Sequence, residues 1–481
     1  MKKIIDSLLK NNLSIFGSIN KVEKINVGFT NTIYSINDSY IVKICTNIDN
    51  EESFLKEIEF YKHNQDNPLI PKMYFSSTDK KEIPYFYEII EKIDGVSLYN
   101  VWHIFNEDKR EEIIKQLCIA MKQIHSNVGK SYDWNKFIKD KFIKLYFQAN
   151  DLNIFNEEEE KIIKYAYSKF DKYLNSKDFV LIHNDLHFDN IFYNNGKIKL
   201  IDFERSMYAP RDYELDILYR MIRRPWKYAS ESVWQYTDSK DYSNIILYIE
   251  KYYKELISIP YLSQRLAIYD MVYNLKHLIK HPNLDELKND IVLDSKIVAL
   301  KDEMSFESIN TPKELMDFMD INIKYGWIDK NGGKHFNNLK GFRENYRISS
   351  LDEMLKSGVG TCIEQAKMIK FFFDRKGINN KVYCHRSYET EENYDKEVKM
   401  HCFVLFYYDN GWYHFEHSNI PKKGIHKYIS LDTAIKDITS GFKERGDIRK
   451  LTESDSIPDK LTFKDFNQFV NEFDNIKIKA I

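Results

Sequence analysis

The sequence of 481 residues lacks long apolar runs and is poor in cysteine. It opens with two lysines, but no continuous apolar core follows them, and no later stretch approaches the roughly 20 apolar residues of a membrane span. We therefore expect neither a secretion signal nor a membrane anchor. The five cysteines are odd in number and show no close pairing, which argues against a disulfide framework. The expected location is the reducing cytoplasm.

An excess of charge of one sign is also missing, because 71 Lys and Arg nearly balance 73 Asp and Glu. The net charge of -2 gives no reason to expect nucleic acid or an anionic membrane as a partner. Glycine and proline are scarce, and no repeat or low-complexity tract stands out. Hydrophobic residues make up 43% of the chain, which is enough for real cores. The length exceeds what one core usually fills, so two or three domains are expected.

The segment of residues 180–204 combines a short apolar strand, a polar loop and a hairpin. Residues 191–193 and 198–201 have the apolar character of strands, and Asn195-Gly196 between them is a favoured two-residue turn. Reversal of the chain at this turn brings Asp202 back beside the polar loop. Residues distant in sequence are therefore expected to meet.

The side chains that meet there suit a divalent cation and a proton acceptor. Asp185 and Asn190 lie in the loop, and Asp202 follows the hairpin. Two carboxylates and an amide oxygen form a hard, oxygen-rich site suited to Mg²⁺, and one carboxylate could instead accept a proton from a hydroxyl. His, Asn and Asp also populate ordinary turns. The combined pattern His-x-Asp-x-x-x-x-Asn, hairpin, Asp-Phe-Glu nevertheless favours function.

The motif HNDLHFDN followed by IDFE resembles the aminoglycoside phosphotransferase and choline kinase family. The resemblance implies a bilobal protein-kinase-like fold and transfer of the γ-phosphate of ATP or GTP to a hydroxyl of a small molecule, aminoglycoside-like or other. It also implies that Asp185 deprotonates that hydroxyl and that Asn190 and Asp202 hold Mg²⁺. The usual family motif is His-Gly-Asp-Leu-His-Pro-x-Asn, so Asn184 and Phe188 depart from it at positions that shape the loop.

The expected nucleotide-binding residues precede this motif. Gly28 lies where a strand would bend over a ligand, although isolated strand glycines commonly mark bulges. Lys43 alternates with apolar neighbours in IVKIC and therefore needs an anionic partner, either phosphate or carboxylate. In kinase-like folds such a Lys pairs with a Glu of the next helix, here Glu57, with Glu59 as a substitute. Glu91 opens a stretch that resembles the interlobe connector, whose backbone would bind the nucleotide base.

A second group of chemically active residues lies near the C-terminal end. Cys362 opens a predicted helix that ends at Gly377, and the helix dipole lowers a thiol pKa from its reference of about 8.5. Downstream, the stretches HCFVLFYY and WYHFEH flank an Asp-Asn-Gly turn and predict a hairpin. Strand parity places His401 and Leu405 on one face. We expect Glu416 opposite Leu405, and therefore on the His401 side and offset along the sheet.

A thiolate at a helix start, a histidine on the next sheet and an acid that orients it form a nucleophilic triad. The arrangement GxGTC with Cys362, then His401, then the stretch ending at Glu416 resembles the transglutaminase-like cysteine superfamily over about residues 312–425. This resemblance implies a papain-like α+β domain with acyl-transfer or amide-hydrolysing activity. That family normally has Asp at the third position. The alternative is a buried structural cysteine with an incidental histidine.

We therefore expect an α+β protein in which a bilobal kinase-like part precedes a transglutaminase-like part. The boundaries are N-lobe 1–95, C-lobe with catalytic loop and acceptor pocket 96–292, linker 293–311, and transglutaminase-like domain 312–481. The kinase resemblance covers about residues 15–290. Two alternatives stay open: one half is a catalytically silent sensor or scaffold that regulates the other, or the kinase acts on a protein. Nothing in the residues identifies the acceptor.

Overall fold

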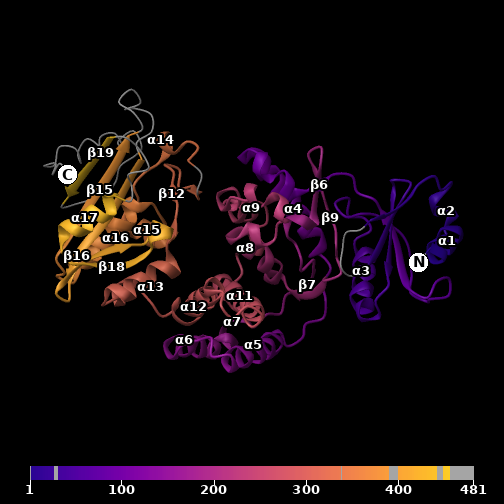
Figure 1. The fold of residues 1–481 in the computed structure, drawn as a ribbon, viewed down its shortest axis with the longest axis horizontal. Coiled ribbons are helices and arrows are strands. Elements are labelled where there is room, and N and C mark those ends of the chain that lie inside the picture. Colours follow the sequence, from indigo (N-terminus) through magenta and orange to yellow (C-terminus); the bar gives the residue numbers. More distant parts are fainter. Residues whose placement is uncertain (1, 26–30, 337–338, 389–398, 441–447, 455–481) are drawn as a thin grey trace. The chain divides into compact units, whose positions relative to one another are not determined.

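The computed structural model divides the chain into two compact units, residues 1–298 and 299–481, each considered by itself below (Figure 1). It describes residues 2–25, 31–336, 339–388, 399–440 and 448–454. The division falls inside the predicted linker of residues 293–311, but helix α12 (Asp285–Leu300) forms the first part of that segment. Over the described ranges, no helix has both the length and the apolar character needed to cross a bilayer.

The first unit begins with an antiparallel five-stranded sheet in the order β1-β2-β3-β5-β4. Its strands are β1 (Val22–Ile25), β2 (Thr32–Ile36), β3 (Tyr40–Cys45), β4 (Met73–Ser77) and β5 (Phe86–Glu91). Helices α1 (Lys2–Asn11) and α2 (Leu13–Phe16) pack on one face through an apolar cluster that includes Val42 and Ile44. Helix α3 (Glu51–His63) packs against Cys45 on the other face. Alternation along β3 therefore turns Lys43 toward α3.

Strands β2 and β3 pair as a hairpin around residues 37–39. Residues 26–30, between β1 and β2, lie outside the described residues. The turn between β2 and β3 places Asn37 and Asp38 at φ 54°. Asn and Asp tolerate this left-handed conformation better than most residues, which is why this short polar turn closes the hairpin.

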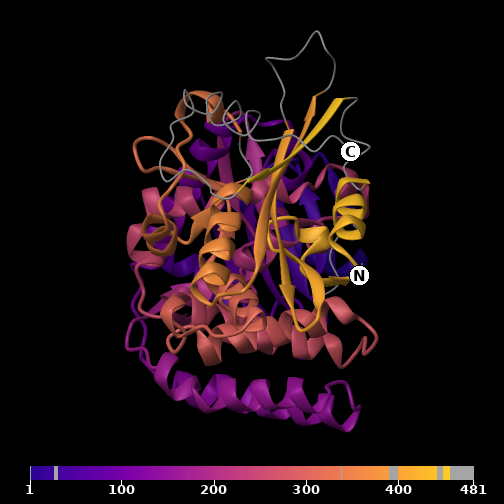
Figure 2. The same cartoon turned by 90° about the vertical axis from the view of Figure 1, so that its left-hand side faces the viewer.

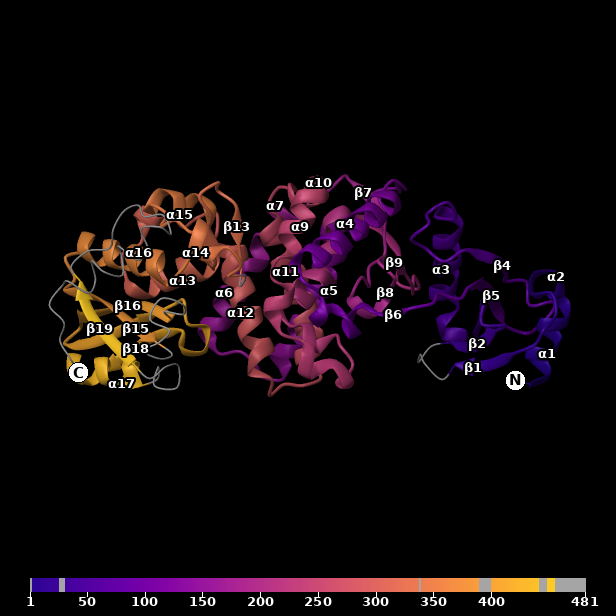
Figure 3. The ribbon, with the colours of Figure 1, turned by 90° about the horizontal axis from the view of Figure 1, so that it is seen from above.

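The second lobe of this unit is mainly helical, and α4 packs with α9 and α5 with α11 (Figure 3). Its helices are α4 (Glu107–Ile124), α5 (Trp134–Asp151), α6 (Glu157–Ser168), α7 (Phe170–Tyr173), α8 (Leu215–Arg223), α9 (Ile245–Tyr252), α10 (Lys254–Ile257), α11 (Leu262–Leu278) and α12. The Asn106 side chain caps α4 by accepting from the Lys109 N–H at 2.9 Å, as the sequence predicts. Cys118 is an ordinary buried core residue of the same helix.

Short strands of the second lobe carry the predicted loop and hairpin. They are β6 (Val96–Ser97), β7 (Phe179–Ile182), β8 (Ile191–Asn194), β9 (Lys197–Leu200) and β10 (Met207–Pro210). The order β6-β8-β9 forms one small sheet, and β7 pairs with β10 in another. Gly95 enters this region at φ 133°, and a Cβ there would lie 2.5 Å from the Tyr193 carbonyl oxygen. Only glycine allows so close an approach between the connector and the hairpin.

The second unit is built on an antiparallel sheet in the order β18-β17-β16-β15-β19. Its strands are β15 (Asn380–Tyr388), β16 (Lys399–Tyr408), β17 (Gly411–Glu416), β18 (Gly424–Tyr428) and β19 (Ile448–Ser454). Figure 2 shows α16 (Cys362–Arg375) and α17 (Leu431–Ser440) on opposite faces of the sheet. Separate apolar clusters fix the two helices, with Val404 facing α16 and Leu405 facing α17.

The remaining elements of this unit surround α16. They are α13 (Pro312–Asn322), α14 (Phe342–Asn345), α15 (Leu351–Ser357) and the short strands β11 (Lys324–Tyr325), β12 (Trp327–Ile328), β13 (Lys334–His335) and β14 (Val359–Gly360). Thr311 begins α13 with a capping box to Glu314, and proline occupies the first turn.

The β16–β17 hairpin is present, but its register differs from the prediction. Leu405 pairs with His414, so Glu416 does not lie opposite Leu405. The two-residue turn at Asp409 and Asn410 fixes this register, with φ 43° and 56°. Glu416 follows His414 by two residues, and side chains alternate with period two, so Glu416 keeps the predicted face and lies two residues closer to His401.

Candidate functional sites

The hairpin of the first unit brings its end back to the loop. Asn195 and Gly196 have φ 46° and 89°, as the short turn requires. The Ile201 N–H then donates to the Asn190 carbonyl at 3.0 Å. This backbone bond joins the end of the hairpin to the loop and fixes where Asp202 leaves it.

Asp185, Asn190 and Asp202 belong to this connected group. The Asn190 Nδ2 donates to the Asp185 carbonyl at 2.8 Å and lies 3.5 Å from the Asp185 carboxylate. The Asp202 Oδ1 lies 3.9 Å from the Lys43 Nζ of the first lobe. Arg205 places its guanidinium 3.6 Å from the Asp185 carboxylate. Loop, hairpin and first lobe therefore converge.

Lys43 is buried and forms an ion pair with Glu57 of α3. Burial is the largest single effect and would lower the pKa of Lys43, but Glu57 and the other nearby acids together outweigh it and raise that pKa. Glu88 lies opposite Lys43 on β5 and is fully buried. Burial and the neighbouring Glu57 raise the pKa of Glu88 well above its usual range. Glu88 is therefore a neutral acid beside a charged pair, a feature that the sequence analysis missed.

Glu214 fixes the backbone at the start of the loop through hydrogen bonds. Its carboxylate accepts the backbone N–H groups of His183 at 2.7 Å and Asn184 at 3.0 Å, and it also contacts His125. Asn184 adopts φ 61°, the left-handed conformation for which the related motif uses glycine. His183 is buried and its Nε2 pairs with the Ile201 carbonyl at 2.9 Å. These contacts hold the His183 side chain in place, so that it supports the loop.

Phe203, between the hairpin and Glu204, packs against α3. Its ring stacks on Phe60 with centroids 4.0 Å apart and meets Tyr61 edge-on at 5.2 Å. The same helix carries Glu57. The side chain that follows Asp202 therefore contacts the helix that positions Lys43.

Of the two remaining predicted nucleotide-binding residues, Glu91 lies within the described residues. Glu91 ends β5, and its carboxylate binds the Lys199 Nζ at 2.5 and 2.6 Å and the Lys72 N–H at 3.1 Å. These contacts tie the end of the first lobe to the hairpin strand β9. Gly28 lies outside the described residues.

Comparison with known proteins identifies most of this unit. Residues 21–231 match the phosphotransferase enzyme family. This match covers the lysine strand, α3, the loop and the hairpin, and does not reach residues 299–481. No curated protein matches the chain.

Solved structures of aminoglycoside phosphotransferases are similar to the chain. The ADP-bound crystal structure of APH(2'')-Ib has 15% sequence identity and a TM-score of 0.43, covering 61% of this chain and 96% of that one. The APH(4)-Ia ternary complex with AMP-PNP and hygromycin B has 17% identity and a TM-score of 0.41, covering 62% and 100%. The GDP and kanamycin complex of APH(2")-IIia has 15% identity and a TM-score of 0.42, covering 63% and 100%.

The donor atoms of the phosphotransferase-family segment suit magnesium bound together with a nucleotide. Within the described part of the chain, no three His, Cys, Asp or Glu side chains converge on one metal position. Asn190 and Asp202 supply only oxygen donors, and Mg²⁺ commonly binds one or two protein oxygens while phosphates and water complete its octahedron. The residues present therefore fit this ion.

The second unit places Cys362 at the start of α16. The Thr361 side chain caps the helix by accepting from the Ile363 N–H at 3.2 Å, and Glu364 completes a capping box. Cys362 thus occupies the first turn, where the helix dipole favours a thiolate. Its side chain is buried.

His401 and Glu416 reach the same place. The His401 Nε2 lies 2.8 Å from the Glu416 carboxylate, which also accepts from the Asn419 N–H at 2.9 Å. Burial would lower the pKa of His401, but hydrogen bonds with Cys362 and Glu416 raise it to about 10. Burial would raise the pKa of Glu416, but the bond from His401 lowers it to about 2. The arrangement favours an imidazolium between two anions.

Cys402 lies in the apolar cluster between β16 and α16 and also contacts Cys362. A hydrogen bond with Cys402, together with His401, holds the pKa of Cys362 well below its usual range, although burial opposes this. The pairing of β16 with β17 begins at Val404, so residues 400–402 form an open edge. The Cys362 Sγ lies 3.9 Å from the Met400 carbonyl at that edge. Side chains from both faces of β16 can therefore reach the thiol.

The space around the thiol is small. A pocket of about 10 Å³ lies between Cys362, Gln365 and Glu416, large enough for roughly one water molecule. An acyl substrate therefore needs the surrounding side chains to move.

Proposed function

We propose that residues 1–298 transfer the γ-phosphoryl group of ATP or GTP to a hydroxyl of a small molecule. The observation that carries this proposal is the 3.9 Å approach of the Asp202 carboxylate to the Lys43 Nζ, within a segment that matches the phosphotransferase enzyme family. This contact places a lysine that can bind phosphate groups next to a carboxylate that can bind a metal ion. The hydrogen bond from the Asn190 Nδ2 to the Asp185 main-chain carbonyl holds Asp185 in place, and the Asp185 carboxylate is available to the acceptor.

Each side chain has a defined task in this mechanism. The Asp185 carboxylate accepts a hydrogen bond from the acceptor hydroxyl, orients its oxygen for in-line attack and takes its proton. Lys43, steadied by Glu57, binds the phosphate oxygens of the nucleotide. Asn190 and Asp202 would hold Mg²⁺, which neutralises phosphate charge when bound. The γ-phosphorus–oxygen bond to the nucleotide breaks as the bond to the acceptor oxygen forms, and the nucleoside diphosphate leaves.

The test is transfer from labelled ATP and GTP to a panel of hydroxylated molecules, aminoglycosides and a protein included. Asp185→Asn and Asp202→Asn should each lower the transfer rate by about 100-fold or more. Asp178→Asn is the matched control, because Asp178 forms an exposed ion pair with Arg211. Transfer that survives both site variants would remove the proposal. Nucleotide binding without transfer to any acceptor would favour the regulatory alternative, and transfer only to protein the protein-kinase one.

For the second unit we propose a thiol-dependent acyl transfer or amide hydrolysis, on the grounds of the contacts between Cys362, His401 and Glu416. The Cys362 thiolate attacks an amide carbonyl and forms a thioester. The carbon–nitrogen bond breaks, and His401 gives its proton to the leaving amine. Water or a second amine then cleaves the thioester and releases the thiolate. The alternative is that this unit is a catalytically silent sensor or scaffold.

Covalent labelling separates these two roles. Cys362 should react with a small acyl electrophile faster than the other four cysteines, as peptide mass spectrometry would measure. His401→Ala should slow the labelling, and His426→Ala, at an exposed strand histidine, serves as the control. Equal and slow labelling of all five cysteines would leave the structural role.

A further inference from the structure

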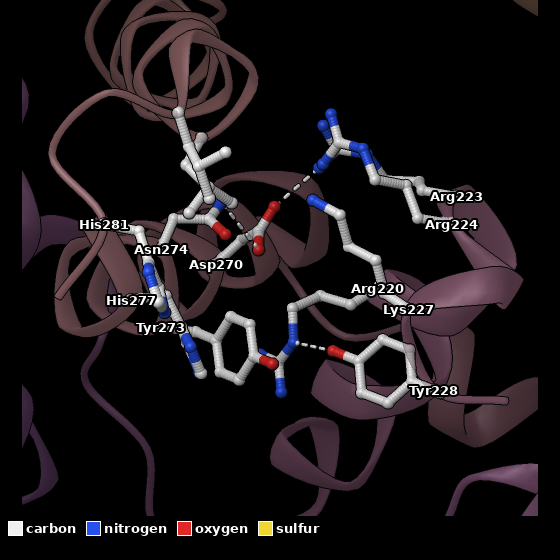
Figure 4. Close-up of a pocket in the computed structure, with 12 residues that line it drawn as sticks. Arg220, Arg223, Arg224, Lys227, Tyr228, Asp270, Tyr273, Asn274, His277 and His281 are labelled. Carbon is white, nitrogen blue, oxygen red and sulfur yellow. Dashed lines mark hydrogen bonds and ion pairs between the residues drawn. The ribbon is translucent and has the colours of Figure 1, made fainter. Parts of the chain in front are cut away.

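A pocket of about 230 Å³ lies between α8, the turn of residues 225–228, α11 and the start of α12 (Figure 4). Its walls are rich in basic side chains and contain a single carboxylate, Asp270. The basic side chains are Arg220, Arg223, Arg224, Lys227, His277 and His281. A pocket with this lining presents donors to a ligand and few acceptors.

The acids that balance these cations lie mostly behind them. Arg223 binds Asp270 at 2.6 Å and Asp290 at 3.2 Å, and these carboxylate side chains are only 3% and 7% exposed. The Arg223 and Lys227 side chains are 25% and 33% exposed. The sum of charges is near zero, but these two acids are buried while Arg223 and Lys227 reach the surface. The buried acids also hold the guanidinium groups in fixed orientations.

Glu286 and His277 also affect how the pocket would bind an anion. Glu286 is half exposed and binds the Lys227 Nζ at 3.0 Å, so a bound anion would compete with it. Burial lowers the pKa of His277, and the neighbouring charges of Lys276, Lys280 and Arg220 lower it further. The local field that His277 experiences is therefore positive.

The pocket adjoins the catalytic loop. Tyr228 lines it and accepts a hydrogen bond from the Arg220 Nε at 2.9 Å. The ring of Tyr228 lies 6.0 Å from that of His187, whose Nε2 is 3.9 Å from the Asp185 carboxylate. The Tyr228 ring and the His187 imidazole thus lie between a molecule in this pocket and Asp185, the proposed proton acceptor.

From this geometry we infer that the acceptor carries an anionic group, a carboxylate or a phosphate, besides the hydroxyl that is phosphorylated. The inference rests on the proposed phosphotransfer and names its substrate class. Guanidinium groups bind carboxylate and phosphate through two parallel hydrogen bonds, and fixed ones lose little entropy in doing so. A polycationic aminoglycoside would instead meet like charges in this pocket.

Calorimetry with 6-phosphogluconate, gluconate, glucose 6-phosphate, glucose and kanamycin tests this inference. We expect at least one of the three anionic probes to bind at least about ten times more tightly than glucose, and the comparison of gluconate with glucose 6-phosphate separates carboxylate from phosphate. Lys227→Gln should weaken that binding several-fold. Lys251→Gln should not, because Lys251 pairs with Glu111 away from the pocket. Arg223→Gln should weaken binding further, provided that circular dichroism shows it folded.

Anionic probes that bind no better than glucose, tighter binding of kanamycin, or unchanged binding in Lys227→Gln would overturn the inference. A transfer assay with the same molecules keeps this separate from the proposed function. Phosphorylation of kanamycin but of no anionic molecule would remove the anionic acceptor and leave the phosphotransferase. Failure to bind ATP and GTP would remove the phosphotransferase itself.

Discussion

Glu57 and Glu88 both face Lys43 from the interior of the first lobe, and one positive charge cannot neutralise two carboxylates. Glu57 holds the ion pair, while burial and Glu57 raise the pKa of Glu88 well above its usual range. A carboxyl whose pKa is raised by folding costs stability above its unfolded pKa of about 4.3, because folding then requires proton uptake. Wild type therefore loses stability relative to a permanently neutral side chain as pH rises.

We expect Glu88→Gln to raise the free energy of unfolding of the first unit at pH 7, by on the order of 1 kcal/mol. The gain should shrink as pH falls toward 4, where Glu88 is protonated in both states. Thermal unfolding at several pH values measures it. Glu57→Gln is the opposing control, since it removes the charged partner of Lys43 and should destabilise. A gain from Glu88→Gln that does not change with pH would contradict a neutral Glu88.

The reactivity of Cys362 should be nearly independent of pH over the physiological range. Its pKa lies well below the usual range and that of His401 is about 10, so thiolate and imidazolium coexist between these values. Burial raises the pKa of Cys118 to about 12, so Cys118 should gain reactivity only in strong alkali. Iodoacetamide labelling followed by mass spectrometry from pH 5 to 9 measures both.

Glu416→Gln provides the control for this profile. Without the carboxylate, His401 loses a partner and its pKa falls, which weakens the support of the thiolate. The rise in Cys362 labelling should then shift to higher pH. A wild-type profile that rises only near pH 8.5, as for a free cysteine, would contradict the ion pair.

The sequence was informative about single residues where a motif joined several of them. Asp185, Asn190 and Asp202 could be grouped because a recognisable turn lies between loop and acid. Glu88 could not be found, since a lone acid in an apolar strand reads as an edge charge. Its cross-strand position opposite Lys43 depends on the β3–β5 register, which one sequence does not determine.

At the scale of elements, the loop before the hairpin depends on one unusual backbone conformation. Asn184 has φ 61°, and its Nδ2 donates to the Arg205 carbonyl at 3.0 Å. Asn184→Gly should preserve the conformation and lose that bond and the weaker one to the Met207 sulfur at 3.5 Å, at about 1 kcal/mol. Asn184→Val should cost at least as much again, because a β-branched residue is strained there.

Chemical denaturation measures these costs, and the rate of nucleotide turnover reports whether the loop still positions Asp185. We expect Asn184→Val to lose turnover more than Asn184→Gly. Equal losses in the two variants would show that the side-chain bond matters and the backbone conformation does not.

Elements with strong local signals were predictable. Asn106 before α4, the turns at Asn195-Gly196 and Asp409-Asn410, and Gly377 after α16 each mark a boundary where the structure has one. The order of the strands in the sheet was not predictable. β19 pairs with β15 and not with a strand next to it in the chain, and local sequence holds no information on which strand lies next to which.

At the scale of the whole molecule, the chain divides after Val298 into two compact units. What the sequence does not reveal is whether the two units influence each other. The scaffold alternative requires such influence, whereas two separate activities do not. The two hypotheses therefore differ in how each unit responds when the other binds a ligand or loses its key residue.

For separate activities, we expect magnesium and nucleotide to raise the melting temperature of one calorimetric transition of the full chain and leave the other in place. At a nucleotide concentration 100 times the dissociation constant, the stabilisation is about 2.7 kcal/mol, or several degrees for a unit of this size. Asp202→Asn should abolish the shift and Cys362→Ser should preserve it. Conversely, nucleotide should not alter the rate of Cys362 labelling. A change in that rate, lost in Asp202→Asn, would show that the first unit regulates the second, because the effect would then require nucleotide bound at the first unit.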